Sequence, residues 1–258
     1  MRLSKKQSQL QNQVMELVHS DRRLTEEERY FILENYQESA GALNSLSGAF
    51  FTPEGLARDF AIEVSDGVSI IDLCAGIGRL GFALEQKATR LVCVEYCEAY
   101  IEVGKRVLPD AEWIQGDVFD KELYRGLGFF DWSVSNPPFG QIKTGKYEGD
   151  YRGGLFEYRV IEMGSRISSF GAFIIPQESA SFRYSGERCY REEINDRCRT
   201  FMKQTGITLS NNCGIDTTVY QAEWHGVSPK VEIVTCEFIE KPSSEQQLDI
   251  FADSEEAA

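Results

Sequence analysis

The chain has 258 residues, of which 42% are hydrophobic and 26% charged, and its formal net charge is −14. These values are typical of a globular protein, and the length suits one large or two small domains. The sequence has neither the run of ~18 apolar residues that would predict a membrane span nor the N-terminal apolar segment that would predict a secretory signal. Seven cysteines without a C-x-x-C pair argue against a zinc ribbon or a disulfide framework, so we expect a cytoplasmic protein with no structural metal and no membrane partner.

The first 47 residues predict two helices. Residues 3–19 carry apolar side chains at helical spacing. The second helix starts with a capping box, in which Thr25 is the N-cap and Glu28 lies three residues later, and Gly41 is expected to stop it. We therefore expect residues 1–47 to form a helical cap on the main domain.

From residue 68 onward, short β-branched runs alternate with helical segments. This alternation predicts an α/β fold with a doubly wound, mostly parallel sheet and helices on both faces, as in Rossmann-like proteins. The β-rich runs 217–224 and 230–239 predict a terminal antiparallel hairpin. The expected strands are 68–73, 90–95, 111–114, 131–135 and 172–175, and the expected helices are 80–86, 97–107, 156–167 and 188–204. The predicted domains are the cap, a catalytic domain at 48–241 and a disordered acidic tail at 242–258.

A glycine-rich loop follows the first expected strand. Gly76, Gly78 and Gly81 form G-x-G-x-x-G, and glycines at such a turn let the backbone approach a ligand. Glu95 ends the next expected strand, where a carboxylate can accept hydrogen bonds from both hydroxyls of a ribose. Taken alone, these residues indicate an adenosine cofactor, and NAD would fit.

Two further carboxylates favour a different cofactor. Asp72 directly precedes the glycine loop, where a carboxylate suits an ammonium group and would repel a pyrophosphate. Asp117 follows the third expected strand, where it can accept a hydrogen bond from an adenine amine, with the apolar Val118 beside the ring. These residues therefore fit an adenosine that carries an amino acid better than a dinucleotide.

The turn Ser135-Asn136-Pro137-Pro138-Phe139-Gly140 follows the fourth expected strand and should face the glycine loop. An exocyclic purine amine is a weak nucleophile because its lone pair is delocalised. The Asn136 side-chain oxygen and the Pro137 carbonyl can accept from its two N–H groups and localise that lone pair. The prolines stiffen the turn, and Phe139 offers a flat face to a base taken out of its stack.

These motifs resemble class I S-adenosylmethionine-dependent methyltransferases, specifically the amino-methyltransferases of DNA. Residues 72–78 resemble their cofactor loop, Glu95 the ribose ligand, Asp117 the adenine ligand and residues 136–139 the catalytic motif. Phe50-Phe51-Thr52-Pro53 resembles the additional cofactor motif of the γ-ordered N6-adenine enzymes, which closes over the methionine part. The resemblance covers about residues 48–240, and the motif order favours DNA.

The resemblance implies S-adenosylmethionine as cofactor and methylation of the N6 amine of adenine in DNA. RNA N6-adenine methylation is the closest alternative, followed by protein-glutamine methylation; cytosine N4 methylation is less favoured because those enzymes more often resemble Ser-Pro-Pro-Tyr. The hypothesis of a nicotinamide dehydrogenase is supported only by the glycine loop and Glu95. A further hypothesis is a non-catalytic adaptor that binds a clamp or DNA, and the intact Asp72, Asn136 and Phe139 argue against it. The implied catalytic residues are Asn136, Pro137, Pro138 and Phe139, and the implied cofactor-binding residues are Phe51, Thr52, Pro53, Asp72, Ala75, Gly76, Gly78, Glu95, Asp117, Val118 and Asn136.

The chain has no room for a separate target-recognition domain of ~100 residues, so we expect short or relaxed sequence specificity. Residues 140–203 carry eleven bases and nine acids, a net charge of +2 in a chain whose net charge is −14. Segments 141–155 and 179–199 mix basic and aromatic residues, which suit phosphate contact and base stacking. The candidate nucleic-acid-binding residues are Lys143, Lys146, Tyr147, Tyr151, Arg152, Arg183 and Arg188, and Arg188, Arg191 and Arg199 could share a solvated or a DNA-facing side of a helix.

The acidic tail contains Gln247-Leu248-Asp249-Ile250-Phe251. Large apolar residues in a polar segment suit a short peptide that docks into a preformed pocket. The five residues resemble the bacterial sliding-clamp-binding motif, which implies the polymerase clamp as a partner; the alternative is that the tail packs on its own domain.

Overall fold

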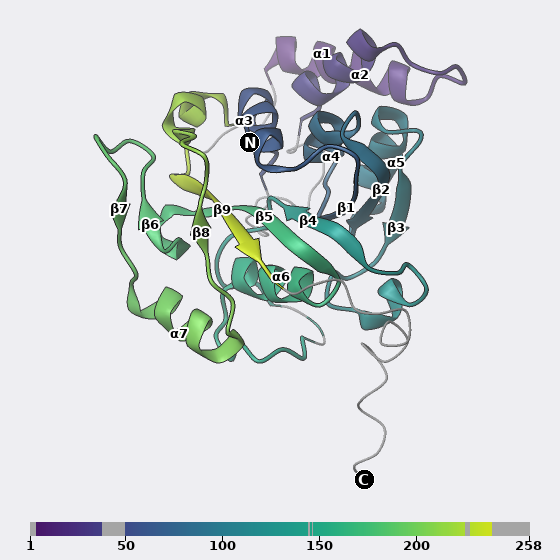
Figure 1. Cartoon of the computed structure of the whole chain (residues 1–258). Coiled ribbons are helices and arrows are strands. Elements are labelled where there is room, and N and C mark those ends of the chain that lie inside the picture. The colour runs from purple at the N-terminus through teal and green to yellow at the C-terminus, as the bar shows by residue number, and fades with distance from the viewer. Residues whose placement is uncertain (1–3, 38–49, 144, 146, 225–227, 239–258) are drawn as a thin grey trace.

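The computed structural model describes residues 4–37, 50–143, 145, 147–224 and 228–238. Its centre is a seven-stranded sheet in the order β3-β2-β1-β4-β5-β9-β8 (Figure 1). The first five strands are parallel, and β9 is antiparallel to both of its neighbours. This confirms the expected doubly wound sheet. The strands are β1 (Val68–Leu73), β2 (Ala88–Glu95), β3 (Glu112–Gln115), β4 (Phe130–Ser135), β5 (Ser168–Pro176), β8 (Ser210–Asn211) and β9 (Val231–Glu237).

Helices cover both faces of the sheet. Because successive side chains of a strand point to opposite faces, Ile70 and Ile71 of β1 belong to different hydrophobic clusters. The cluster around Ile70 includes side chains from α3 (Glu54–Phe60), α4 (Arg79–Leu84) and α5 (Glu98–Val107). The cluster around Ile71 includes side chains from α6 (Phe156–Ser165) and α7 (Asp196–Thr205).

The N-terminal helices α1 (Lys5–Val18) and α2 (Glu26–Asn35) lie over the α4 and α5 side of the sheet (Figure 1). Both helices start with capping boxes, and the Thr25 N-cap is confirmed. Helix α2 ends at Asn35, earlier than expected, while Gly41 lies outside the described residues. Buried Val14 and Ile32 join the cluster around Ile70, so the two helices share the main core.

The expected strand at 217–224 is wrong. Thr217–Glu223 forms the 3-10 helix η6, because the Asp216 side chain accepts a hydrogen bond from the N–H of Thr218 and starts a helical turn. The expected antiparallel order at this end of the sheet is present, but it comes from β9 pairing with β5 and with the two-residue β8.

The expected helix at 188–204 starts later, at Asp196. The Asn195 side chain accepts from the N–H groups of Arg197 and Cys198 and caps α7 there. Before it, β7 (Arg191–Glu192) pairs with β6 (Phe182–Arg183) in a separate two-stranded sheet. Arg188 and Arg191 therefore precede the helix and do not share a helical face with Arg199.

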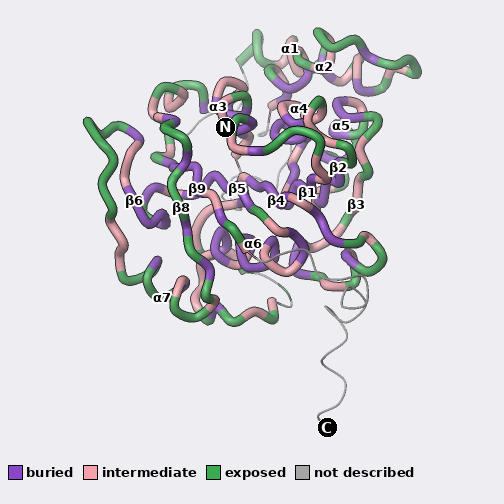
Figure 2. Tube along the Cα trace, viewed as in Figure 1, coloured by how far each residue is buried: buried purple, intermediate pink, exposed green. Residues whose placement is uncertain are grey.

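The strand order reverses at β1, which lies between β2 and β4. In doubly wound sheets, ligands bind beyond the carboxyl ends of the strands at such a point. Figure 2 shows the central strands mainly buried and the β6–β7 connection exposed. Three more 3-10 helices, η3 (Ala61–Glu63), η4 (Lys121–Tyr124) and η5 (Gln177–Ser179), join the larger elements. Within the described ranges, no helix has the length and apolar character needed to cross a bilayer.

Candidate active site

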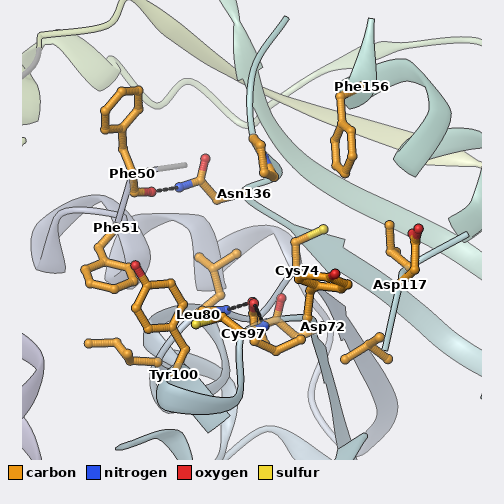
Figure 3. Close-up of a pocket in the computed structure, with 18 of the residues that line it drawn as sticks. Phe50, Phe51, Asp72, Cys74, Leu80, Cys97, Tyr100, Asp117, Asn136 and Phe156 are labelled. Carbon is orange, nitrogen blue, oxygen red and sulfur yellow. Dashed lines mark hydrogen bonds between the residues drawn. The ribbon is translucent and has the colours of Figure 1, made fainter. Parts of the chain in front are cut away.

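A pocket of about 540 Å³ opens at the strand-order reversal (Figure 3). Its walls come from the segment before α3, the loop between β1 and α4, the end of β2, the segment after β3 and the turn after β4. The motifs singled out in the sequence are therefore brought together from five separate parts of the chain.

Most of the candidate cofactor residues line this pocket, whereas Pro53 and Gly78 do not. These two residues are the N-caps of α3 and α4, and Gly78 has the left-handed φ of 90° that favours glycine. The candidate residues that line the pocket are Phe51, Thr52, Asp72, Ala75, Gly76, Glu95, Asp117, Val118 and Asn136.

The four candidate catalytic residues divide in the same way. Asn136 and Pro138 line the pocket. Pro137 is buried, and Phe139 packs against the hydrophobic cluster around Ile70. In this structure the Phe139 ring packs against the core and does not line the pocket, where it was expected to stack on a base.

The side-chain amide of Asn136 is held by two hydrogen bonds through its nitrogen, while its oxygen has none within the described residues. Its amide nitrogen donates to the main-chain oxygen of Phe50 at 3.0 Å and to Oγ1 of Thr52 at 2.9 Å (Figure 3). Because the Phe50 carbonyl can only accept, this contact assigns the nitrogen and oxygen of the amide. The oxygen Oδ1 is buried and has no hydrogen-bond partner among the described residues. An unsatisfied buried acceptor costs about 1–3 kcal/mol, so the side chain is arranged for a donor from outside the chain.

Asp72 is the second buried group without a partner. Its residue is 1% exposed, and neither carboxylate oxygen has a hydrogen bond of normal geometry in the described part of the chain, although a weak interaction with the main chain of Gly81 slightly lowers its pKa. Burial first, and then the nearby charge of Glu95, raise the pKa of Asp72 well above its usual range. A ligand that brings a positive charge would relieve both effects, which fits the ammonium group of an amino acid.

Glu95 is held by main-chain donors. Its Oε2 accepts from the N–H of Gly76 at 2.8 Å, and its Oε1 accepts from the N–H of Cys97 at 2.8 Å. Burial raises the pKa of Glu95, although these hydrogen bonds oppose the shift. Each carboxylate oxygen keeps capacity for a further donor, as ribose binding requires. The carboxylate of Asp117 is oriented similarly, by the N–H of Phe119 at 3.0 Å.

Several pocket residues were missed in the sequence. Tyr100 lies on α5 and packs edge-on against Phe51, with ring centroids 5.2 Å apart, and Tyr36 contacts both rings. The apolar face of the helix after Glu95 could have indicated Tyr100. Arg79 also lines the pocket and is 9% exposed, which is unusual for an arginine. Its position between Gly78 and Gly81 was the available signal.

The turn that carries Asn136 is fixed from behind by a buried glutamate. Glu157 on α6 is 1% exposed. Its Oε2 accepts from the N–H of Gly140 at 2.9 Å, and its Oε1 accepts from the hydroxyl of Ser179 at 2.8 Å. This carboxylate therefore ties the turn after β4 to α6 and to η5.

We expect Glu157→Gln to lower kcat for methyl transfer about tenfold, because the amide loses one acceptor and the turn shifts relative to the pocket. Cofactor affinity, measured by calorimetry, should stay within about threefold, since no cofactor-binding residue is altered. Ser179→Ala is the matched control: it removes the other partner of the carboxylate, leaves the Gly140 bond and should have the smaller effect on kcat. Equal losses in the two variants would contradict this role.

The candidate nucleic-acid residues differ in their exposure and in their contacts. Lys143 lines the pocket, Arg152 and Arg188 are exposed, and Lys146 lies outside the described residues. The prediction that Tyr151 contacts nucleic acid is wrong. The residue is 4% exposed and packs between Tyr158 and Phe201, so its ring has no free face for a base.

Two further candidates are held by internal partners. The Tyr147 hydroxyl donates to Glu162, and its ring lies under the Arg159 guanidinium. Arg183 donates to Glu193 at 2.6 Å and to Gln177 at 2.9 Å. Neither residue is available to a nucleic acid in this arrangement without losing these contacts. The clamp-like peptide 247–251 lies outside the described residues.

Residues 56–148 match the family described as "Methyltransferase small domain". The match covers just over a third of the chain. The matched segment spans β1 to β4, with the glycine loop, Glu95, Asp117 and Asn136. The family match and the fold support S-adenosylmethionine as the cofactor and an S-adenosylmethionine-dependent methyltransferase as the class of enzyme. A search of curated sequences finds no significant match.

The fold of the chain is similar to that of solved structures described as methyltransferases or as modification proteins of restriction enzymes. A proposed RNA methyltransferase from Pyrococcus horikoshii aligns with a TM-score of 0.50 at 16% identity, over 75% of this chain and 89% of that one. The M protein of the type I restriction enzyme EcoKI aligns with a TM-score of 0.53 at 10% identity, over 95% of this chain and 56% of that one. A modification subunit of a proposed type I restriction enzyme from Vibrio vulnificus aligns with a TM-score of 0.54 at 12% identity, over 83% of this chain and 50% of that one. The chain thus spans about half the length of the two restriction-modification proteins.

Proposed function

We propose that this protein transfers a methyl group from S-adenosylmethionine to the N6 amine of adenine in DNA. The observation that carries the proposal is the side chain of Asn136, which lines the pocket with its amide hydrogens bonded internally and its Oδ1 unfilled. An oriented acceptor of this kind suits an amine that donates a hydrogen bond while its nitrogen acts as the nucleophile.

The residues of the pocket fit S-adenosylmethionine. Asp72 would accept the ammonium group, because both of its buried oxygens lack a partner. Glu95 would bind the ribose hydroxyls, and Asp117 the adenine amine, with Val118 beside the ring. Phe51 and Thr52 would cover the methionine part. When bound, the cofactor supplies an electrophilic methyl group on a sulfonium.

The protein itself contributes orientation and hydrogen bonding. Asn136 Oδ1 and the Pro137 carbonyl would accept from the two N–H groups of the target amine and favour a pyramidal nitrogen with a localised lone pair. Orientation of two reactants in this way contributes a large share of catalysis in bimolecular reactions. No strong base is required, because the nitrogen becomes acidic once it is alkylated.

Two observations support DNA as the substrate. The motif order, with Phe-Thr-Pro before the glycine loop and Asn-Pro-Pro-Phe, resembles the γ-ordered DNA enzymes. Two proteins with the same fold are type I restriction-modification proteins by name. RNA is the second candidate, favoured by the likeness to the proposed RNA methyltransferase, which shares the larger fraction of its length.

We propose that exposed cations, among them Lys143 at the pocket and Arg152 and Arg188 elsewhere on the surface, contact phosphates, and that recognition is short or relaxed. The peptide 247–251 would then tether the enzyme to a sliding clamp and raise the effective concentration of DNA at the site. Full-length protein, compared with Phe251→Ala in a clamp-binding titration, tests the tether: unchanged binding in the variant would exclude it.

The substrate is tested by incubating the protein with methyl-labelled S-adenosylmethionine and, separately, DNA, RNA and a mixed protein extract. Mass spectrometry of the digested products identifies the labelled species. We expect label in N6-methyldeoxyadenosine. Label only in N6-methyladenosine from RNA would assign the RNA alternative, and label only in N-methylglutamine would assign the protein alternative; either result would contradict the proposal.

A further inference from the structure

Arg79 occupies an unusual position for a buried cation. It is the first residue of α4, where the positive end of the helix dipole disfavours a positive charge. Its side chain nevertheless lies inside the protein and lines the pocket. Placement of this kind costs stability unless the guanidinium has specific partners, so those partners indicate what the residue does.

The guanidinium bridges two main-chain carbonyls from separate parts of the chain. One terminal nitrogen donates to the oxygen of Thr52 at 2.9 Å, and the other donates to the oxygen of Leu33. Leu33 lies in the last turn of α2, where helix carbonyls lack partners within the helix. Helix α2 has no basic residue in its own last turn, so Arg79 supplies both the hydrogen bond and the positive charge that this end favours.

The contact with Thr52 continues to the catalytic amide. Thr52 is 3% exposed, and its Oγ1 accepts from the amide nitrogen of Asn136 at 2.9 Å. The neighbouring Phe50 carbonyl accepts from the same nitrogen, and the Phe51 ring lies 5.9 Å from the Arg79 guanidinium. A continuous path therefore runs from α2 through Arg79 and the segment 50–52 to Asn136.

We propose that Arg79 is a positioning residue for methyl transfer: it fixes the segment 50–52, through which Asn136 is oriented, and makes helix α2 part of the catalytic site. The inference rests on the proposed function of Asn136. It assigns the N-terminal helices a role beyond covering the core, because Leu33 provides one end of the bridge.

Arg79→Lys tests the bridge, because a lysine keeps the charge but cannot span two carbonyls with a planar fork. Arg29→Lys is the matched control. Arg29 is also a guanidinium between α2 and the domain, but it bonds Glu85 and the Val107 carbonyl and does not contact the segment 50–52. Both variants weaken the docking of α2, and only Arg79→Lys disconnects Asn136.

We expect Arg79→Lys to lower kcat about 10- to 100-fold, the scale of a small misplacement of a reacting group, while Arg29→Lys stays within about twofold. Hydrogen exchange of a peptide covering residues 50–53 should accelerate in Arg79→Lys only. Equal kcat values in the two variants, or unchanged exchange in Arg79→Lys, would overturn the inference.

A second pair of variants covers the case in which Arg79→Lys does not fold. Thr52→Val removes the hydroxyl that accepts from Asn136, and Thr52→Ser retains it. We expect a loss of kcat in the valine variant and its recovery in the serine variant; equal activity of both would overturn the path to Asn136. If the wild-type protein methylates no adenine, the proposed function fails, whereas the exchange comparison still decides whether Arg79 fixes the segment 50–53.

Discussion

Replacement of Asn136 by alanine should reduce methyl transfer by about 10²–10³-fold, the scale observed when one preorganised hydrogen-bonding group is removed from a catalytic site. The variant loses Oδ1, the polar atom of the side chain that has no partner among the described residues, whereas the amide nitrogen is already bonded to Phe50 and Thr52. The measurement is a single-turnover rate with labelled cofactor and DNA.

Cofactor affinity is the control for this variant. Calorimetry should give a Kd for S-adenosylmethionine within about fivefold of the wild-type value, because Asp72, Glu95 and Asp117 are unchanged. A variant that neither binds cofactor nor transfers methyl would show that Asn136 organises the pocket and not the amine. A variant that retains a tenth or more of the wild-type rate would exclude Asn136 as the acceptor.

Asp72→Asn should weaken S-adenosylmethionine binding about 30-fold or more, as expected for the loss of one partner of a buried charge pair. The substitution keeps the size of the side chain and removes its ability to carry a negative charge. The residue is buried and its oxygens have no normal hydrogen bond or ion pair among the described residues, so the ammonium of the ligand is the group that its charge would serve. Unchanged affinity would contradict this assignment.

The same substitution should stabilise the protein without ligand. Because burial raises the pKa of Asp72 in the folded state, the unfolded chain releases this proton at a lower pH than the folded chain does. The contribution of Asp72 to folding stability is therefore fully present below its unfolded-state pKa of ~3.9 and is lost as pH rises towards the raised pKa. The gain in Tm of Asp72→Asn over wild type should increase with pH through this window. A constant difference in Tm would contradict the raised pKa.

The affinity of the wild-type protein for the cofactor should rise with pH, whereas the contribution of Asp72 to folding stability falls. A bound ammonium favours the ionised form of Asp72, so wild-type affinity for S-adenosylmethionine should strengthen as pH rises through the raised pKa of the free protein. Glu95, whose pKa burial also raises, adds to this dependence. Asp72→Asn should show a shallower pH dependence in the same calorimetric titration, and equal slopes would assign the effect to other groups.

The sequence predicted those parts of the site that are local motifs. Alternation of strands and helices placed residues 72–78, Glu95, Asp117 and Asn136 after parallel strands, and parallel strands bring such positions to one edge of a sheet. The structure places Asp72, Gly76, Glu95, Asp117 and Asn136 in one pocket, whereas Gly78 caps α4 and does not line it. The prediction succeeded there because each motif combines backbone conformation and chemistry within a few residues.

Other features depend on contacts between distant residues. Arg79 bonds main-chain carbonyls 27 and 46 positions away, and a carbonyl has no signature in the sequence. Residues 217–223 are β-rich in composition, yet the Asp216 cap and the bond from Tyr220 to Asp59 hold them as a 3-10 helix. Tyr151 was expected to contact nucleic acid, but its ring fills the space between Tyr158 and Phe201. Tertiary packing decided each of these cases.

The central claim is that Asn136 Oδ1 accepts a hydrogen bond from the amine that receives the methyl group. Its most direct test is a crystal structure with an S-adenosylmethionine analogue in which an amine-bearing carbon replaces the methylated sulfonium. We predict that the analogue amine lies within about 3.2 Å of Asn136 Oδ1, a normal hydrogen-bond distance, with the ligand ammonium on Asp72. An analogue bound elsewhere, or bound with its amine directed away from Asn136, would contradict the account.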